Sequence, residues 1–254
     1  MPPKAIWVEL VAVSCTDPSA CTAVGGVINN GIDAQEKPLA ESWDGTAWSL
    51  ESTPNPHAEN GSVLSGVACP VPGACEAVGD YAYADVDQLV FAFGWNGASW
   101  TRQRQPNPGG SYLNSENSVS CSGTAACTSI GTWIDFGGRI RGLAEHWDGT
   151  SWTIQPVPTP AGFAISELFG VSCVGGSACT AVGDWSTSPY GLPTLTLAER
   201  WNGTAWEGQA TPSPTGAKVS TLKGVDCNSP LACVAVGNSY AGGVTQTLIE
   251  SYSG

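Results

Sequence analysis

The chain carries ten cysteines in five Cys-x5-Cys pairs: Cys15 with Cys21, Cys69 with Cys75, Cys121 with Cys127, Cys173 with Cys179 and Cys227 with Cys233. Successive first cysteines lie 54, 52, 52 and 54 residues apart. A fixed period of this length is the sequence signature of a repeat architecture. The spacing therefore predicts five units of one kind. Residues that recur in every unit are expected to be structural, and function is expected where the units differ.

Each cysteine pair is expected to form one disulfide, because the count is even and the pairs are regular. Five disulfides indicate an oxidising compartment. A reduced chain with buried thiols is the alternative. A zinc site is disfavoured, because the short spacing of zinc motifs is missing and the chain has only 2 His. Met1 to Lys4 do not begin a signal peptide, so we expect either a mature domain or part of a longer secreted chain.

The composition favours short strands joined by turns. Only 12% of residues are charged, while the chain has 32 Gly and 18 Pro, which suit turns and disfavour helices. The net charge of -13 repels phosphate backbones, so we expect no nucleic-acid partner. We also expect no membrane insertion, because no apolar run approaches the roughly 20 residues of a membrane span.

Each unit follows one pattern of four strands. An apolar strand ends in the first Cys, and a short turn leads to the second Cys, which opens a strand such as Cys179-Thr180-Ala181-Val182-Gly183. Two strands flanking such a turn predict a β-hairpin. A third strand, Leu-Ala-Glu-x-Trp or a relative, then runs into Asp-Gly or Asn-Gly, the strongest short hairpin signal. The fourth strand begins at Trp48, Trp100, Trp152 or Trp206.

Four antiparallel strands repeated five times describe an all-β, five-bladed β-propeller with one disulfide per blade. The repeats run approximately over 10–61, 62–113, 114–165, 166–219 and 220–254, in one domain that spans 1–254. The fifth repeat stops before its fourth strand. We expect an N-terminal strand at 5–9, with Trp7 in the place of Trp48, to pair with Leu248–Tyr252 and close the ring. An open stack, or a fragment of a longer propeller, is the alternative.

The turns Trp43–Trp48, Trp95–Trp100, Trp147–Trp152 and Trp201–Trp206 resemble the Asp-box turn of sialidase-type propellers in position and turn chemistry, although their spacing departs from that motif. The blade count resembles tachylectin-2-type lectins and the five-bladed glycosidases. The Cys-x5-Cys repeat also resembles uncharacterised secreted repeat proteins of bacteria. The resemblance implies the fold and leaves function open, because propellers host many chemistries.

The loops that join second to third strands differ between repeats, at roughly 26–38, 80–88, 132–141, 184–196 and 238–247. In a propeller they share one face, which is therefore the functional candidate. Aromatic rings stack on sugars, and carboxylates bond to hydroxyl groups. The alternative is that these aromatics fill the space between blades. The candidate ligand-binding residues are Tyr81, Tyr83, Asp85, Trp133, Asp135, Asp184, Trp185, Tyr190 and Tyr240.

An enzyme is disfavoured. A glycosidase needs two carboxylates at a defined separation, whereas Glu41, Glu145, Glu199 and Glu250 recur in four of the five repeats and are interpreted as structural. Unrepeated acids, among them Glu36, Asp87 and Glu167, stand in no recognisable catalytic setting. We therefore name no catalytic residue, no metal ligand and no cofactor. Asp85-Val86-Asp87 could supply oxygen ligands to calcium, but a solvated acidic loop is favoured.

The sequence thus predicts a secreted or cell-surface, non-catalytic recognition module whose partner is most simply a glycan. Multivalent weak pockets on one face would suit that role. A protein–protein or structural module of an extracellular assembly is the second hypothesis, and a glycosidase is the third.

Overall fold

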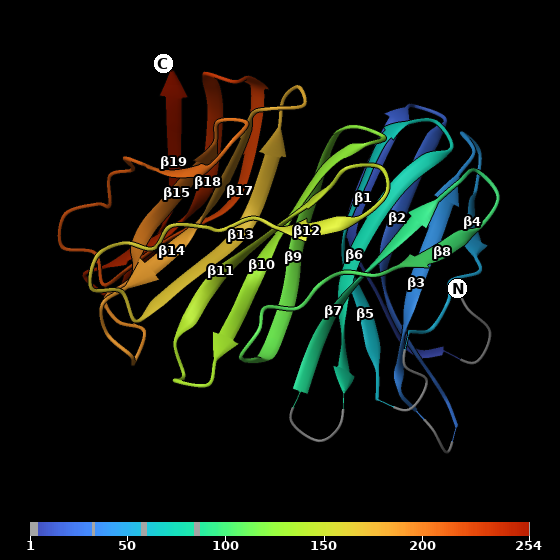
Figure 1. Cartoon of the computed structure of the whole chain (residues 1–254), viewed down its shortest axis with the longest axis horizontal. Coiled ribbons are helices and arrows are strands. Elements are labelled where there is room, and N and C mark those ends of the chain that lie inside the picture. The colour runs from blue at the N-terminus through green and yellow to red at the C-terminus, as the bar shows by residue number, and fades with distance from the viewer. Residues whose placement is uncertain (1–4, 32–33, 57–59, 84–86, 254) are drawn as a thin grey trace.

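The computed structural model describes residues 5–31, 34–56, 60–83 and 87–253 and shows an all-β chain of 19 strands. The strands form three sheets, of 4, 12 and 3 strands, and their antiparallel pairings divide them into five consecutive units, named units 1 to 5 (Figure 1). Single parallel pairs, Gln88 with Leu113 and Ile140 with Ile165, join units 2, 3 and 4 into the large sheet. Units 1 and 2 are β1 (Ala5–Asp17), β2 (Ala20–Asn29), β3 (Glu36–Trp43), β4 (Trp48–Glu51), β5 (Ser62–Val71), β6 (Ala74–Tyr83), β7 (Asp87–Trp95) and β8 (Trp100–Gln103).

Units 3 to 5 repeat the same order, except that unit 5 ends with its third strand. They are β9 (Ser111–Gly123), β10 (Ala126–Asp135), β11 (Ile140–Trp147), β12 (Trp152–Ile154), β13 (Ile165–Cys173), β14 (Cys179–Ser186), β15 (Leu195–Trp201), β16 (Trp206–Gln209), β17 (Val219–Ser229), β18 (Ala232–Ala241) and β19 (Val244–Ser253). In each unit every strand pairs antiparallel with the next one in the chain.

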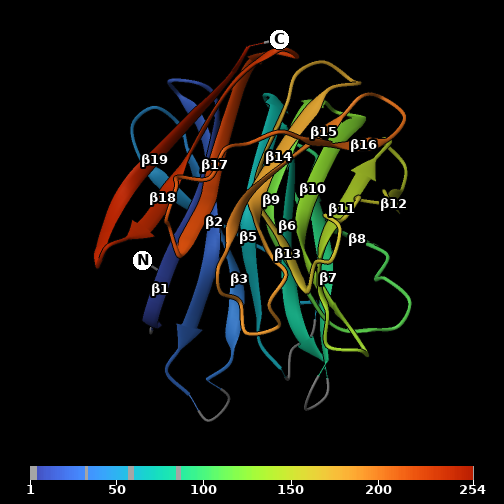
Figure 2. The ribbon, with the colours of Figure 1, turned by 90° about the vertical axis from the view of Figure 1, so that its left-hand side faces the viewer.

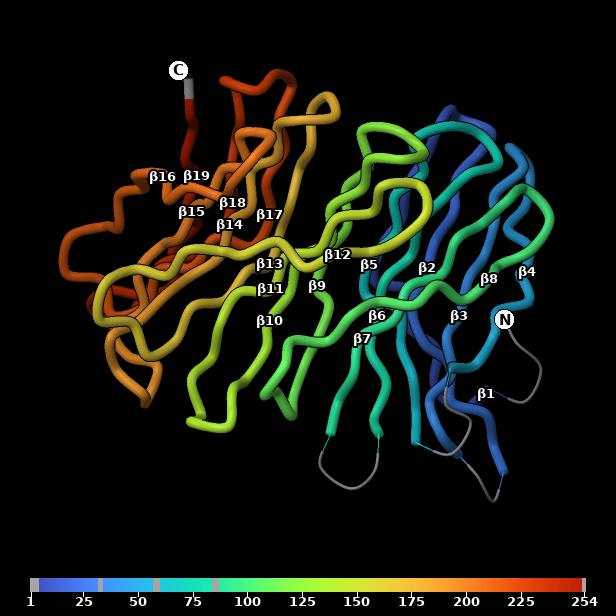
Figure 3. The backbone as a smooth tube through the Cα atoms, in the orientation of Figure 1, coloured from blue at the N-terminus to red at the C-terminus, as the bar shows by residue number. Residues whose placement is uncertain are grey.

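All five predicted disulfides are present, one across the first hairpin of each unit. They join Cys15 with Cys21, Cys69 with Cys75, Cys121 with Cys127, Cys173 with Cys179, and Cys227 with Cys233. The turns of these first hairpins lie at the upper edge of the backbone trace in Figure 3, whereas the loops β10–β11 and β14–β15 lie at the lower edge. We call these two sides the hairpin face and the loop face. Among the described residues no helix is long and apolar enough to cross a membrane.

The prediction that the second cysteine opens the second strand was wrong for Cys21 and Cys75. Each is the second residue of its strand, because β2 begins at Ala20 and β6 begins at Ala74. The alanine also comes first in units 3 and 5, and only in unit 4 does the cysteine open the strand. The physical reason is that backbone pairing continues past the disulfide toward the turn, where Ala20 pairs with Asp17. These disulfides therefore lie within the hairpin ladder rather than at its end.

Cys21 and Cys75 hold equivalent repeat positions but differ in their surroundings. Cys75 is only 5% exposed, and Thr22 Oγ1 of unit 1 lies 3.7 Å from its sulfur, whereas Cys21 is half-buried. Both cysteines line a cavity of about 150 Å³ between units 1 and 2 on the hairpin face, together with Cys69. Their sulfurs are joined in disulfides, which leaves no thiolate to bind a metal. Both cysteines therefore have a structural role.

The first strands of the five units meet around one central space. Ala12, Gly66, Ser118, Gly170 and Gly224 occupy the same position of successive first strands, and all five line a cavity of about 300 Å³. The small side chains let these strands approach one another at the centre. Each unit therefore presents its first strand to a shared centre and its last strand to the outside.

A repeated glycine follows from a bulge in each first strand. The pairing between the first two strands shifts by one residue near Leu10, Leu64, Leu168 and Leu222. A β-carbon at the opposite glycine, such as Gly183, would overlap the backbone carbonyl of the first strand. Glycine is therefore required wherever the bulge brings the two backbones together.

The turn between the third and fourth strands is built by one side chain. Asp44 Oδ1 accepts hydrogen bonds from the backbone N–H groups of Thr46 and Ala47, and Gly45 takes a positive φ of 92°. Asp148 and the asparagines of units 2 and 4 make the same bonds. The two flanking tryptophans then pair, with ring centroids 5.7 Å apart for Trp43 and Trp48.

Neighbouring units are joined by apolar cores of one design. In the joint between units 3 and 4, Ile130 and Ala144 of unit 3 pack with Leu168, Ala181 and Trp206 of unit 4. The other joints use equivalent positions. Burial of this apolar area supplies the main attraction between units.

The expected closure of the ring by residues 5–9 was wrong. These residues form the start of β1 and pair with β2, Ala5 with Asn29 and Leu10 with Gly25, while the recorded partner of β19 is β18. The physical reason is chain length. The tryptophan that begins each fourth strand stands 16 residues before the bulge in the first strand of the next unit, as Trp48 does before Leu64. Trp7 stands only 3 residues before Leu10, which marks the bulge of unit 1. Three residues span at most ~10 Å, less than the ~14 Å between the first and fourth strands of a sheet.

Among the described residues no pairing joins β1 to β19, and Figure 1 shows the two termini on opposite sides of the view. Val236 and Ile249 of unit 5 are 47% and 70% exposed, whereas the equivalent Val182 and Ala198 of unit 4 are 1% and 7% exposed. At the other end Val13 and Trp48 of unit 1 are 60% and 45% exposed. Figure 2 shows unit 5 from its exposed side.

Removal of one disulfide should lower the free energy of unfolding. For the double variant Cys121→Ser with Cys127→Ser we expect a loss of ~2 kcal/mol from the small closed loop. We expect ~1 kcal/mol more because Cys127 is fully buried and burial of a polar hydroxyl group costs free energy. The double variant Cys15→Ser with Cys21→Ser opens a loop of equal length, in which Cys15 is exposed and Cys21 is half-buried. It should therefore lose only the ~2 kcal/mol that comes from opening the loop. Urea unfolding checks both values, and unchanged stability in both variants would show that the bridges are not formed.

Candidate functional site: a polar cavity on the loop face

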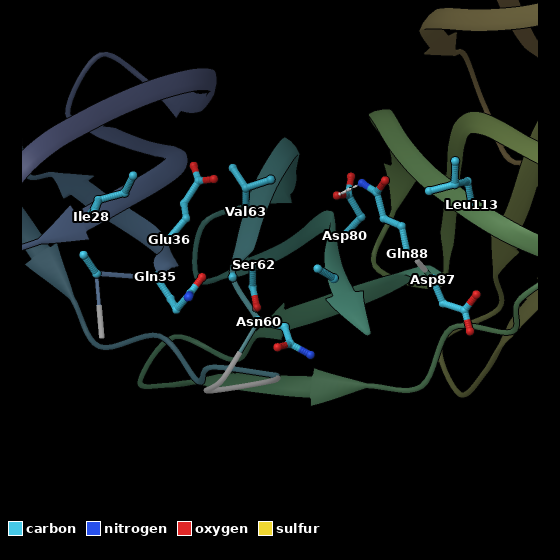
Figure 4. A pocket seen from close by; sticks show the side chains of 13 residues that line it. Ile28, Gln35, Glu36, Asn60, Ser62, Val63, Asp80, Asp87, Gln88 and Leu113 are labelled. Atoms are coloured by element: carbon cyan, nitrogen blue, oxygen red, sulfur yellow. Dashed lines mark hydrogen bonds between the residues drawn. The ribbon is translucent and has the colours of Figure 1, made fainter. Parts of the chain in front are cut away.

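A polar cavity of the described residues opens on the loop face between units 1 and 2. Its volume is about 520 Å³. Figure 4 shows the polar side chains that surround it: Gln35, Glu36, Asn60, Ser62, Asp80, Asp87 and Gln88. Ile28, Val63 and Leu113 supply apolar wall. A concave site with apolar wall and a few polar groups is the usual form of a small-molecule site.

Asp80 lies at the end of the buried part of β6, where the strand passes from the core to the loop face. Its Oδ2 accepts a hydrogen bond from the side-chain amide of Gln88 on β7. Burial raises the pKa of Asp80 to about 6, against the opposing effects of Gln88 and of a backbone hydrogen bond from Glu116. The negative charge of Glu36 raises it further.

Glu36 begins β3 and lies on the other side of Val63 in Figure 4. Its carboxylate occupies the space above Gly26, and a β-carbon at position 26 would overlap it. Gly26 stands at the same repeat position as Asp80, five residues after the second cysteine. Unit 1 thus supplies a carboxylate from its third strand, and unit 2 supplies one from its second. Burial, and then the charge of Glu9, raises the pKa of Glu36.

The arrangement offers both donors and acceptors to a polyhydroxylated ligand. The carboxylates of Glu36, Asp80 and Asp87 accept hydrogen bonds, and the amides of Gln35 and Asn60 can do both. No aromatic ring is among the described residues that line this cavity. Among the described residues no cluster of three or more His, Cys, Asp or Glu could hold a metal ion.

The candidate residues named from the sequence do not converge on this cavity. Tyr81 is only 9% exposed and packs against Phe91 in the core, and its hydroxyl oxygen accepts from Arg102. This placement agrees with the alternative that aromatics fill the space between blades. Tyr83 is 47% exposed at the end of β6. Asp85 lies outside the described residues.

Trp133 and Asp135 belong to a separate cluster at the end of β10. The Arg141 guanidinium lies 5.4 Å from the centre of the Trp133 ring and forms an ion pair of 3.1 Å with Asp135. Hydrogen bonds, led by that from the backbone N–H of Arg139, lower the pKa of Asp135. These groups thus satisfy one another within unit 3.

Asp184 and Trp185 lie on β14. Asp184 is buried and accepts a hydrogen bond from Thr221 of unit 5, and burial raises its pKa to about 7. Trp185 packs beside the joint between units 3 and 4 and lines a cavity of about 290 Å³. Tyr190 and Tyr240 are 92% and 38% exposed on the loop face. A ligand role for the exposed aromatics stays a prediction.

The cavity itself uses residues that sequence reasoning treated in two ways. Glu36 and Asp87 stand out in the sequence as unrepeated acids, and Asp80 begins the variable segment 80–88, but none of the three is among the predicted ligand-binding residues. Asn60, Ser62 and Gln88 were missed. Their signal was weak, since Asn60 lies just before β5 and Ser62 begins it, outside the variable segments between second and third strands. The cavity forms because the crossover between units 1 and 2 reaches the same face.

No protein-family model matches the sequence, and no curated protein matches it. Solved structures are similar to it at the level of fold. A fungal fucose-specific lectin from Aleuria aurantia, a six-bladed β-propeller, is 12% identical with a TM-score of 0.51, over 100% of this chain and 78% of the lectin. A second structure of that lectin is 10% identical with a TM-score of 0.50, over 99% of this chain and 81% of the lectin.

A polysaccharide lyase described as an ulvan lyase is 10% identical with a TM-score of 0.54, over 98% of this chain. This chain spans 64% of the lyase, less than two thirds of its length. Identities this low show a shared fold alone. The chain is therefore an all-β, propeller-like repeat protein with five Cys-x5-Cys disulfides.

Proposed function

We propose that this protein is a secreted five-bladed propeller that binds carbohydrate, without catalysis, in the polar cavity of the loop face. The observation that carries the proposal is the cavity itself. Three carboxylates and several amides surround one space whose remaining wall is apolar. Sugars present alternating hydroxyl groups and C–H faces, and both kinds of surface find partners there. A central space lined by all five first strands supports the count of five blades.

Two further observations support the proposal. Five disulfides suit an oxidising, extracellular setting. The fold is shared with a fucose-specific lectin. A glycan partner also fits the net charge of -13, because a neutral sugar is not repelled by an acidic surface.

Asp80→Asn should weaken glycan binding about tenfold. The change keeps the shape of the side chain but removes a charged acceptor, whose hydrogen bonds contribute ~1.5–3 kcal/mol. Asp184→Asn is the matched control, because Asp184 occupies the same repeat position in unit 4 and lies outside the cavity. A glycan array identifies the ligand, and titration calorimetry then compares the variants. Equal loss in both variants, or no glycan bound by the wild type, would reject the proposal.

Glycoside hydrolysis in the same cavity is the second candidate function. The observation that favours it is the pair Glu36 and Asp80, two carboxyl groups of raised pKa inside one cavity. Glycosidases use such a pair, one as acid and one as base or nucleophile. Release of reducing sugar from a bound glycan, abolished by Glu36→Gln and by Asp80→Asn, would establish it. The Gln88 amide donates a hydrogen bond to Asp80, which keeps this carboxylate as an acceptor. That contact favours glycan binding over glycoside hydrolysis.

A further inference from the structure

A second cavity lies at the joint between units 3 and 4, beside the fourth strand of unit 4. Its volume is about 290 Å³. Pro158 and Pro160 of the crossover between these units form part of its wall, and Trp185 on β14 and Leu197 on β15 form another part. We call it the joint cavity. It is separate from the polar cavity between units 1 and 2, because the two share no lining residue among the described residues.

Glu199 on β15 is the only charged residue among the described residues that line the joint cavity. It is only 2% exposed, and its Oε2 atom has no hydrogen-bond partner in the part of the chain that the structure describes. Burial raises the pKa of Glu199 to about 7, without an opposing contribution from a cation of the described residues. A buried carboxylate without a donor or a cation costs free energy. A ligand that supplies a charged donor therefore removes this cost.

The repeat shows which donor meets a carboxylate at this position. Glu250 holds the place of Glu199 in unit 5, and Thr211 Oγ1 of the preceding crossover donates a hydrogen bond to its Oε2. Thr211 stands five residues after the tryptophan that begins β16. Val157 stands five residues after the tryptophan that begins β12. The crossover before Glu199 therefore carries an apolar side chain where the next crossover carries a donor.

A glycine beside Glu199 opens the carboxyl group to the cavity. Gly208 on β16 pairs with Glu199 and lines the joint cavity as well. A β-carbon at Gly208 would lie 4.0 Å from both carboxyl oxygens. The equivalent residues are Ile154 in unit 3, opposite Glu145, and Leu50 in unit 1. Because opposite residues of an antiparallel pair point to the same side, unit 4 leaves open a space that a large side chain takes in these units.

The other end of the cavity is aromatic. Trp185 pairs with Leu195, which stands four residues before Glu199 on β15, and four residues of a strand span ~13 Å. The two prolines and Leu197 add further apolar wall. The joint cavity thus offers one charged acceptor near one end and an apolar, aromatic surface toward the other.

We propose that the joint cavity binds a small organic amine, whose ammonium group bonds to Glu199 and whose carbon chain extends toward Trp185. An ammonium group carries three donors and no acceptor, and its hydrogen bonds to a carboxylate are among the stronger ones in proteins. The carbon chain gains free energy from burial against the apolar wall. A metal ion fits less well, because it needs several oxygen ligands and the cavity supplies one carboxylate. Amine binding here is independent of carbohydrate binding between units 1 and 2.

The probes are n-hexylamine and hexan-1-ol, which share one carbon chain and differ in the charged group. Titration calorimetry of the full chain at pH 8, where most of the Glu199 carboxyl is ionised, should show one hexylamine bound per chain. Hexan-1-ol should bind at least tenfold more weakly, because its hydroxyl group has no charge to pair with the carboxylate. Nα-acetyl-lysine amide carries the ammonium group on a peptide backbone. It should also bind more weakly than hexylamine, because the apolar wall leaves its backbone groups without partners.

Three variants locate the site. Glu199→Gln should weaken hexylamine binding at least tenfold and leave hexan-1-ol binding nearly unchanged. Glu41→Gln is the matched control, because it changes the equivalent position of unit 1, outside the joint cavity, and it should leave both affinities unchanged. Gly208→Ile places the side chain of unit 3 over the carboxyl group and should abolish binding of both probes.

Equal binding of hexylamine and hexan-1-ol, no binding of hexylamine, or a Glu199→Gln chain that binds hexylamine as tightly as the wild type would overturn the proposal. Tighter binding of the lysine derivative than of hexylamine would overturn it too, since the cavity would then suit a lysine side chain of another protein. Circular dichroism of each variant confirms that it is folded. Glycan binding is measured in parallel, and Glu199→Gln should leave it unaltered, so that a failure of either kind of binding is seen separately.

Discussion

Glu145→Gln is expected to stabilise the protein at pH 8 and to flatten the dependence of its stability on pH. Glu145 is fully buried in unit 3, and neither carboxyl oxygen has a hydrogen-bond partner among the described residues. Burial raises its pKa to about 8 from an ordinary value of 4.5. Near it lies Glu116, whose pKa burial and the Glu145 charge also raise.

The direction of the effect follows from the two protonation states. Between pH 4.5 and about 8 the unfolded chain has lost the proton of Glu145 while the folded chain retains it. Stability is therefore full below pH 4.5 and falls as the pH rises through that window. Each unit of pKa shift corresponds to ~1.4 kcal/mol, so the wild type should be several kcal/mol more stable at pH 5 than at pH 8.

Glutamine at this position remains neutral at both pH values and removes this contribution. Glu41→Gln is the control, because it changes the equivalent position of unit 1, where the side chain is only half buried. Urea unfolding at pH 5 and pH 8 measures all three proteins. A wild type that is more stable at pH 8, or a Glu145→Gln slope as steep as that of the wild type, would contradict the protonated state of the buried pair.

Trp206→Ala should cost ~3–5 kcal/mol of stability, whereas Trp48→Ala should cost less than ~1 kcal/mol. Both residues begin the fourth strand of their unit, and each ring packs against the tryptophan that ends the third strand of the same unit. They differ in that unit 3 packs on Trp206, which is 4% exposed, while Trp48 of unit 1 is 45% exposed. The comparison isolates the joint between units from the turn within a unit.

Thermal or urea unfolding of the two variants provides the measurement. Trp152→Ala serves as a second buried example, since it too is 4% exposed and bonds to a glutamine of the preceding unit. Equal losses for Trp48 and Trp206 would show that unit 1 is covered in solution by another surface. Such a result would mean that the array is closed or paired.

The sequence predicts most of the fold because the fold is periodic. The cysteine spacing locates each first hairpin, and the tryptophan turns locate the third and fourth strands, so both local elements and their order are confirmed. The local pattern could not show that residues 5–9 fail to act as a fourth strand, because these residues are apolar and carry a tryptophan, Trp7, as the fourth strands do. Only its position, 3 residues before Leu10, excludes that role. Residue counting across the loop, rather than residue type, decides this point.

The candidate site was harder to predict because it depends on exceptions to the repeat. Gly26 leaves room for Glu36 only because unit 1 lacks the aspartate of unit 2. Glu116 replaces an apolar residue in one joint and makes a buried polar network with Gln105 and Ser129. Both exceptions can be identified in the sequence. Only the packing shows that the exception at Gly26 lies at a cavity, whereas Glu116 is buried in the joint between two units.

The most direct test of a carbohydrate site in the loop-face cavity is an NMR map of the labelled protein with a glycan selected from an array. The account predicts that amide signals of Glu36, Ser62, Asp80 and Gln88 shift on titration, while those of the disulfide hairpins, such as Thr124 and Gly175, stay in place. Shifts confined to the hairpin face, or to the aromatic residues around Trp133 and Tyr190, would contradict it.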